Sequence, residues 1–202
     1  MGKKQKIFGC SLDNLVKRAE QELKKSNTST INLDESSKSI KRKPITIWNI
    51  EGIFRKNSSV KDLTKAKKII EEEGMLNLEK YERKDAILVS GLFKNFLAEM
   101  QGRVIPYKIY TKLKESKSDA EIKDILKELS INHYETLNYI NQFVLILNDH
   151  CETNYMNLAN LSIVIGPNLF ELTNDEMINL NITVESSEIY KNILRIRKTE
   201  RE

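Results

Sequence analysis

The sequence predicts an all-α fold, a bundle of about seven to nine helices, and three observations support this prediction. Apolar residues recur at three- and four-residue spacing along most of the chain, which is the period of helices packed on a core. The 202 residues include only 7 glycines and 3 prolines, too few turn residues for a many-stranded β fold. Apolar residues make up 40% of the chain, enough to bury a core, so global disorder is not expected.

The first quarter of the chain divides into segments of different composition. Residues 1–10 contain several lysines and predict a basic, flexible tail, with the main domain at 11–202. Apolar residues at helical spacing predict a helix at 11–25. The stretch 26–43 is rich in Ser, Thr, Asn and Lys, and we interpret it as a flexible polar insertion. Residues 45–54 are apolar, and their pattern fits either an extended buried segment or a short helix.

The later helices can be located from their apolar stripes and their ends. Ser58 or Ser59 is expected to cap the next helix, and Gly74 to end it. The helix at 155–165 is apolar almost all round, which predicts a central position. The other helices are expected at 86–100, 120–129, 134–147 and 184–197.

The charge balance excludes several classes of function. There are 33 basic and 29 acidic residues, and the net charge of +4 is too mild to indicate nucleic-acid binding. No apolar run approaches the roughly 18 residues of a membrane span. We therefore expect a cytoplasmic monomer, with weak contact between the basic tail and an anionic membrane surface as a lesser alternative.

No catalytic or cofactor site of the chain's own is predicted. Cys10 and Cys151 lack metal-ligand spacing and are expected to be reduced thiols. His133 and His150 likewise have no ligand partners at metal spacing, so no metal is expected. The chain has no glycine-rich phosphate loop, so neither GTP nor another cofactor is expected to bind it directly.

Three short segments, taken in order, carry the strongest functional signal. They are Glu51–Lys56 (EGIFRK), Leu92–Glu99 (LFKNFLAE) and Asn160–Leu169 (NLSIVIGPNL). In this order and at these separations they resemble the signature blocks of RhoGAP domains, over roughly residues 45–197. Residues 8–12 also resemble the lead-in of that family.

The resemblance implies a GTPase activator for a Rho-family small GTPase in its GTP-bound state. The implied catalytic residue is Arg55, which the activator inserts into the active site of the GTPase. An arginine supplied in trans accelerates hydrolysis by on the order of 10³–10⁵, because it stabilises the charge of the transition state. Ile53 and Phe54 can anchor the loop before Arg55, and the capped helix can hold it after.

A partner-binding face is expected around Lys94. Lys94 shares a helical stripe with Gly91 and Ala98, whose small side chains let another segment approach closely. We expect this face to meet the GTPase and to hold the loop of Arg55, although an ordinary exposed lysine is the alternative. The resemblance further implies a partner contact by Asn160 and at the position of Arg103, and Ile163, on the same helical face as Asn160, is also expected to contact the partner. For Asn160, a hydrogen bond to local backbone is the alternative, and Asn168 is expected to be a turn or cap residue.

Two departures from the family pattern keep a second function open. The family usually has a long helix before the Glu51–Lys56 block, and here residues 26–50 are mostly polar. Either the helix at 11–25 fills that place in the core, or the place is poorly filled. Ala98 replaces an arginine of the middle block, while Gln101 and Arg103 replace its prolines. The alternative is therefore a RhoGAP-like module that binds small GTPases or other partners as an adaptor without accelerating hydrolysis.

Overall fold

The computed structural model describes residues 7–28, 47–74, 81–173, 176 and 179–201, and this part of the chain is helical, as predicted. Two isolated β-bridges join loops, one between Ser11 and Gln101 and one between Ile105 and Phe170. None of the described helices has both the length and the apolar character that a membrane crossing needs. The α-helices are α1 (Leu12–Thr28), α2 (Val60–Glu73), α3 (Ala86–Glu99), α4 (Tyr107–Glu115), α5 (Asp119–Leu126), α6 (Ile131–Asp149), α7 (Cys151–Asn154), α8 (Leu158–Ile165) and α10 (Leu180–Arg201). In the described part of the chain, three 3₁₀ turns accompany these helices: η1 (Ile47–Asn49), η3 (Arg83–Asp85) and η4 (Gly166–Asn168).

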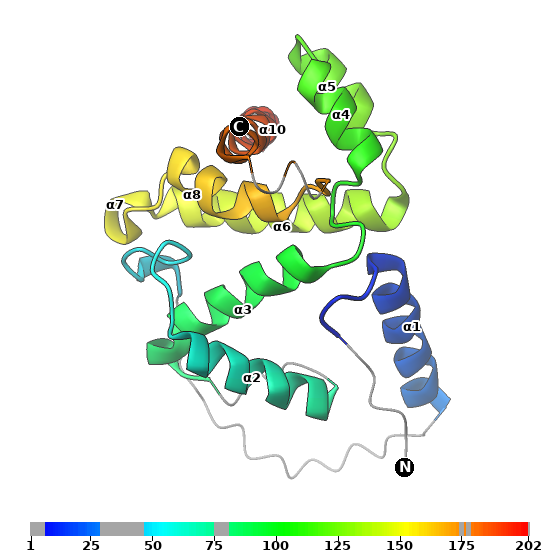
Figure 1. The fold of residues 1–202 in the computed structure, drawn as a ribbon, viewed down its shortest axis with the longest axis vertical. Helices are drawn as coiled ribbons and strands as arrows, with labels where there is room; N and C mark the ends of the chain where they lie inside the picture. Colours follow the sequence, from blue (N-terminus) through cyan, green and yellow to red (C-terminus); the bar gives the residue numbers. More distant parts are fainter. Residues whose placement is uncertain (1–6, 29–46, 75–80, 174–175, 177–178, 202) are drawn as a thin grey trace.

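Helix α6 crosses the middle of the molecule, with α4, α5 and α10 on one side and α2 and α3 on the other (Figure 1). Helix α8 packs on α6 and α10, and its residues Leu161 and Ile165 are fully buried. Gly166 permits the close contact with α10, because a Cβ at this position would lie 3.1 Å from Cβ of Tyr190. The predicted central place of this segment is confirmed.

Helix α2 begins and ends at the predicted residues. The side chain of Ser59 accepts a hydrogen bond from the backbone N–H of Asp62 at 3.1 Å, which satisfies a free donor of the first turn. Gly74 adopts a left-handed conformation (φ 75°), and its N–H donates to the carbonyl of Ile70 at 2.8 Å. The cap residues therefore fix the ends of the helix that follows Arg55.

Three helices differ from the prediction: α4 and the short α7 were not expected, and α8 begins later than expected. The sequence pattern gave no helix at Tyr107–Glu115, yet α4 forms there, because Pro106 is compatible with a helix start and Ile109 and Leu113 bury one face. The helix expected from residue 155 begins only at Leu158. Its start is set by Asn157, whose side chain accepts from the N–H of Asn160 at 2.9 Å.

The predicted flexible tail at 1–10 is wrong for its last four residues. Phe8 is buried, and its ring packs edge-on against Phe96 at 6.1 Å. The backbone N–H groups of Ile7 and Phe8 donate to the carboxylate of Glu71 at 2.9 and 2.8 Å. This lead-in therefore belongs to the folded domain. Residues 1–6 and 29–43 lie outside the described part of the chain, and 26–28 form the last turn of α1.

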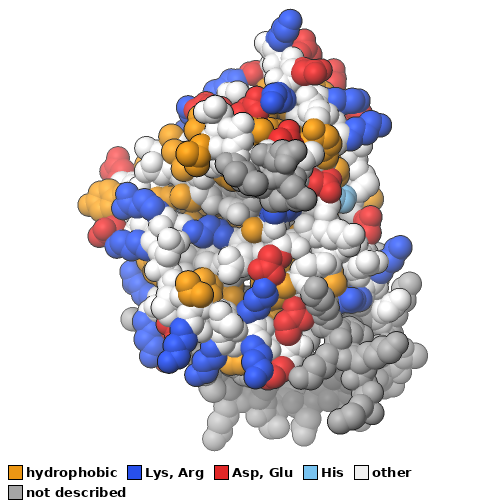
Figure 2. Space-filling view, viewed as in Figure 1, with side chains coloured by type: hydrophobic (Ala, Val, Ile, Leu, Met, Phe, Trp, Pro, Cys, Tyr) orange, Lys and Arg blue, Asp and Glu red, His pale blue; other side chains and the backbone are white. Residues whose placement is uncertain are grey.

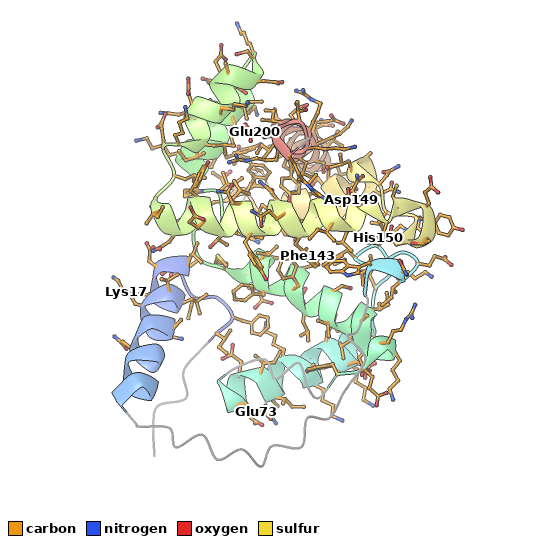
Figure 3. The ribbon with its side chains drawn as sticks, turned by 180° about the vertical axis from the view of Figure 1, so that it is seen from behind. Lys17, Glu73, Phe143, Asp149, His150 and Glu200 are labelled. Carbon is orange, nitrogen blue, oxygen red and sulfur yellow. The ribbon has the colours of Figure 1, made fainter. Side chains whose placement is uncertain are left out.

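Helix α1 contributes to the core near its start, and residues 29–46, which precede the Glu51–Lys56 block, lie outside the described part of the chain. Leu12 joins the core and Val16 packs against it, where α1 contacts α6. An apolar cleft of about 640 Å³ remains between α2, α3 and α6, lined by aromatic side chains that include Phe93 and Phe143. Figure 3 shows Phe143 extending from α6 toward α3. Among the described residues this part of the core is therefore loosely filled.

Candidate functional site

The loop between η1 and α2, residues 50–59, carries Arg55, and we call it the finger loop. It turns sharply because Gly52 and Phe54 both have positive φ, at 68° and 66°. A left-handed Phe costs on the order of 1–3 kcal/mol. The aromatic contacts of Phe54 offset this cost: its buried ring packs edge-on against Phe93 at 5.9 Å and Phe143 at 5.8 Å. The loop is thereby held in one conformation by the core.

Arg55 is exposed at the tip of this turn. The two residues before it, Ile53 and Phe54, are 1% and 2% exposed, so the chain leaves the core immediately before the guanidinium. The side chain of Arg55 makes no hydrogen bond or ion pair with any residue in the described part of the chain. Its positive charge is available to a partner.

Lys94 of α3 fixes the backbone immediately before Arg55. Its ammonium group donates to the carbonyl of Phe54 at 2.6 Å and lies 3.4 Å from Oδ1 of Asn57. Burial against the loop lowers the pKa of Lys94. The side chain therefore tethers the finger loop and is not an ordinary exposed lysine.

A cleft of about 360 Å³ lies beside Arg55. Gly91 lets the loop and α2 approach α3 there: a Cβ on Gly91 would lie 3.0 Å from Cδ2 of Leu63 and 3.3 Å from Oγ of Ser58. The approaching atoms belong to side chains and not to another backbone. Segments 51–56, 92–99 and 160–169, far apart in the sequence, meet at this cleft. The lining residues are Arg55, Asn57, Ser58, Leu63, Gly91, Lys94, Asn95, Val164 and Asn168.

Two predicted contact residues on α8 lie outside the lining of this cleft. The amide of Asn160 donates to the carbonyl of Tyr155 at 3.1 Å, which is the local backbone bond foreseen as the alternative. Ile163 is 59% exposed, an unusual position for a large apolar side chain on a central helix. Asn168 donates to the carbonyl of Val164 at 3.0 Å, which gives it the expected capping role, and it also lines the cleft.

The two remaining predicted residues lie at the far end of α3. Ala98 is half-buried, one turn beyond Lys94. Arg103 adopts a positive φ of 51°, and its guanidinium donates to the carbonyl of Leu97 at 3.0 Å. Burial lowers the pKa of Arg103. The guanidinium of Arg103 therefore satisfies a free carbonyl at the C-terminus of α3, where a positive charge also complements the helix dipole. Its guanidinium is turned inward as a result.

The comparison with protein families decides the family of this chain. The family model described as RhoGAP domain matches residues 31–174, which is more than half of the chain. The chain belongs to the RhoGAP family. This RhoGAP domain is 28% identical over 127 residues to Rho GTPase-activating protein gacF of Dictyostelium discoideum, a match covering 60% of the chain and 11% of that protein. It is 26% identical over 133 residues to Rho GTPase-activating protein 15 of Rattus norvegicus, covering 62% and 28%.

Solved structures show the same fold as this RhoGAP chain. The crystal structure of human Rho GTPase activating protein 15 (ARHGAP15) superposes with a TM-score of 0.70 at 19% identity, covering 95% of this chain and 90% of that chain. The BH domain of GRAF, the GTPase regulator associated with focal adhesion kinase, gives a TM-score of 0.60 at 17% identity, with coverages of 73% and 82%. The chain spans less than a third of the two relatives named above.

The sequence did not reveal the part that Asn154 plays in the RhoGAP fold. Asn154 is fully buried at the end of α7. Its amide donates to the carbonyls of Trp48 and Leu147 at 2.9 and 2.8 Å, and its Oδ1 accepts from the N–H of Met156 at 2.7 Å. Its own carbonyl accepts from the N–H of Gly52 at 2.8 Å. One asparagine thus joins the finger loop and η1 to α6 and to the segment before α8, and no local pattern marks this tertiary role.

Proposed function

We propose that this domain accelerates GTP hydrolysis by a Rho-family small GTPase in its GTP-bound state, by inserting Arg55 into the active site of the GTPase. One observation carries the proposal: Arg55 is exposed and unpaired among the described residues, on a loop whose neighbouring atoms are fixed. The names of the relatives, which are Rho GTPase-activating proteins, support the choice of partner.

The chemistry requires a charge that is fixed before the reaction. Negative charge spreads over the transferring phosphoryl oxygens in the transition state, and a guanidinium can contact two of them. The gain is large only when the donor is already positioned and water is excluded. Lys94 and Phe54 supply the positioning on this side, and the docked GTPase supplies the exclusion of water. The domain is in this view an activator that completes another protein's active site.

The docking surface that we propose surrounds the cleft. Ile163 and Asn160 on α8 contact the GTPase on one side of Arg55. Lys94 acts mainly by holding the finger loop, while Ala98 and Arg103 lie toward the edge of the contact. The domain acts as a monomer, and it comprises residues 11–202 together with the anchored residues 7–10.

An adaptor function is the second candidate, and one observation favours it. At positions 98 and 103 an alanine and an inward-facing arginine stand where the family pattern has an arginine and a proline. Loss of these two contacts would weaken support for the finger or for docking, and the domain would then bind GTPases without activating them.

A panel of Rho-family GTPases separates the two functions. Each GTPase is loaded with GTP, and single-turnover hydrolysis is measured with and without excess domain, alongside equilibrium binding to the same GTPase loaded with a non-hydrolysable GTP analogue. The proposal predicts that at least one member is accelerated by on the order of 10³ or more. Binding without acceleration supports the adaptor function. Absence of both binding and acceleration across the panel contradicts both candidates.

A further inference from the structure

Helix α2, which follows the finger loop, carries its charges in an order that does not favour helix stability. Its lysines lie in the first nine residues, whereas its last turn contains Glu71, Glu72 and Glu73 and no basic residue. A cation near the N-terminus of a helix or an anion near its C-terminus is unfavourable by about 0.3–1 kcal/mol. The charges of α2 therefore need another explanation.

Several of these charges have internal partners. Glu71 accepts the backbone hydrogen bonds of Ile7 and Phe8 that anchor the lead-in. Lys67 forms an ion pair with Glu99, and its ammonium lies 4.7 Å from the ring centre of Phe8. These residues are explained by the attachment of the lead-in to α2 and α3.

Three other lysines have no such explanation. Lys61, Lys65 and Lys68 are exposed and lie at i, i+4 and i+7, on one face of α2. Within the described part of the chain, Lys61 and Lys65 make no hydrogen bond or ion pair through their side chains. Lys68 has only a distant partner, with its ammonium 4.0 Å from Glu72 and its side chain 78% exposed. We call these three residues the lysine stripe.

The lysine stripe begins close to the finger loop in the chain and lies on the side of α2 that faces away from the cleft. Helix α2 begins five residues after Arg55, and its residue Leu63 lines the cleft beside that arginine. Lys61 and Lys65 flank Leu63 in sequence and occupy the opposite, outward side of the helix. Figure 2 shows Lys and Arg side chains gathered at the lower left of the molecule, over the start of α2 and the finger loop.

We infer that the lysine stripe attracts an acidic surface of the partner GTPase and steers it toward the finger loop. The choice of partner rests on the proposed function. Lysine is depleted in the tightly packed centres of interfaces, because its flexible side chain is costly to order. Its charge instead acts at long range, and such steering raises association rates by about 10–10³ at low salt. The stripe therefore acts on association and not on the hydrolysis step.

The composition of this face favours a protein partner over a membrane. A helix that lies on a bilayer inserts several large apolar or aromatic side chains. Here Val60 is the exposed large apolar residue of α2, and Asp62 interrupts the lysines. Such a mixture of discrete charges complements an acidic protein surface better than a uniformly anionic lipid surface.

Charge reversal of the stripe tests the inference. The variant K61E/K65E/K68E is compared with K17E/K108E/K117E, which makes the same change of net charge at exposed lysines on α1, on α4 and before α5. The three control lysines also have no side-chain ion pair in the described part of the chain. Association and dissociation rates are measured by stopped flow with a GTPase that carries a non-hydrolysable GTP analogue, from low to high salt. Thermal melting checks that all variants fold.

The stripe variant should associate about 10-fold more slowly than wild type at low salt, and the difference should vanish at high salt. The control variant should lose far less, and dissociation and saturated single-turnover hydrolysis should be unchanged in both. Equal losses of association rate in the two variants, or an unchanged association rate in the stripe variant, would overturn the inference. Binding of both variants to phosphatidylserine vesicles is measured in parallel, and a stripe variant that loses only this vesicle binding would also overturn it. If wild type binds a GTPase with this dependence on the stripe but does not accelerate hydrolysis, the inference stands and the proposed catalysis fails. If wild type accelerates hydrolysis but its association rate does not depend on the stripe, the proposed catalysis stands and the inference about the stripe fails.

Discussion

At the scale of single residues, Lys94 shows how a side chain of α3 can hold the loop that carries Arg55. Its ammonium holds the Phe54 carbonyl, and the pKa of Lys94 is lowered by the burial that this contact requires. The sequence could predict that Lys94 faces the loop, because Gly91 and Ala98 mark that side of the helix. It could not predict the bond to a carbonyl, which depends on the left-handed turn at Phe54.

Replacement of Lys94 by methionine removes this bond while keeping most of the apolar stem. With a saturating concentration of the Lys94→Met domain, we expect the single-turnover rate of GTP hydrolysis to fall on the order of 10-fold. This corresponds to a rise of about 1.4 kcal/mol in the activation free energy, because the finger loop is positioned less well. The rate is compared with that of Lys94→Gln, whose amide can still donate a hydrogen bond and should recover part of the activity. A wild-type rate for Lys94→Met would show that the tether is unimportant.

At the scale of elements, Asn154 decides how the finger loop is joined to the bundle. The variant Asn154→Ala leaves two carbonyls and one N–H without their buried partner. Each unsatisfied buried group costs about 1–3 kcal/mol, so we expect a loss of about 3 kcal/mol or more in the free energy of unfolding. Urea denaturation measures this loss. The exposed Asn192→Ala serves as the control and should change stability by less than about 0.5 kcal/mol. A similarly small effect at Asn154 would contradict its structural role.

For Tyr190 of α10, in contrast to Asn154, we predict that removing the polar group does not destabilise the fold. Its hydroxyl is buried without a hydrogen-bond partner among the described residues, and burial strongly raises its pKa. Tyr190→Phe removes a desolvated polar atom and keeps the ring, so the free energy of unfolding should stay equal or rise by about 1 kcal/mol. Thermal unfolding checks this outcome. A clear loss of stability would mean that the hydroxyl has a partner after all.

The elements also show where sequence reasoning reaches its limit. Helices α2, α3 and α6 were predictable because each carries a long apolar stripe or a recognisable cap. Helix α4 was not predicted because it has only nine residues and directly follows Pro106, a residue type that often marks the end of a helix. The short α7 and the later start of α8 were not predicted, because Tyr155 takes a left-handed conformation that its residue type does not announce.

At the scale of the whole molecule, ion pairs attach α10 to α5. Arg195 pairs with Asp119 at 2.9 Å and Lys123 with Glu200 at 2.9 Å. The hydrogen bond from Arg195 lowers the pKa of Asp119, and the one from Lys123 lowers the pKa of Glu200. Carboxylates with depressed pKa values stabilise the fold above their unfolded values, about 3.9 for Asp and 4.3 for Glu, and this stability is lost as pH falls further.

We therefore expect the melting temperature to fall as the pH drops below about 4, and to fall less steeply in the double variant D119N/E200Q. Melting curves recorded from pH 3 to 7 test this expectation. Glu152→Gln provides a matched control, because Glu152 is exposed and has no ion pair in the described part of the chain. If the melting temperature falls equally steeply with decreasing pH in wild type and in the double variant, these ion pairs contribute little to stability.

The meeting of the three signature segments is also a property of the whole molecule. Periodicity places each segment on a helix or loop but carries no information about contacts between segments that lie far apart in the sequence. Only the resemblance to a family indicated that they share one surface. The structure brings Arg55, Lys94 and Asn168 to a single cleft, whereas Asn160 and Arg103 bond to nearby backbone instead.

The most direct test of the account is single-turnover GTP hydrolysis by a responsive Rho-family GTPase with saturating wild-type domain, Arg55→Ala or Arg55→Lys. We predict that Arg55→Ala loses on the order of 10³-fold or more of the acceleration while its affinity for the GTPase bound to a GTP analogue stays within a few-fold, because the finger acts in the transition state. Arg55→Lys should also be strongly impaired, since an ammonium cannot contact two oxygens in the same way. If Arg55→Ala accelerates hydrolysis as well as wild type, Arg55 is not the catalytic finger and the proposed mechanism is wrong.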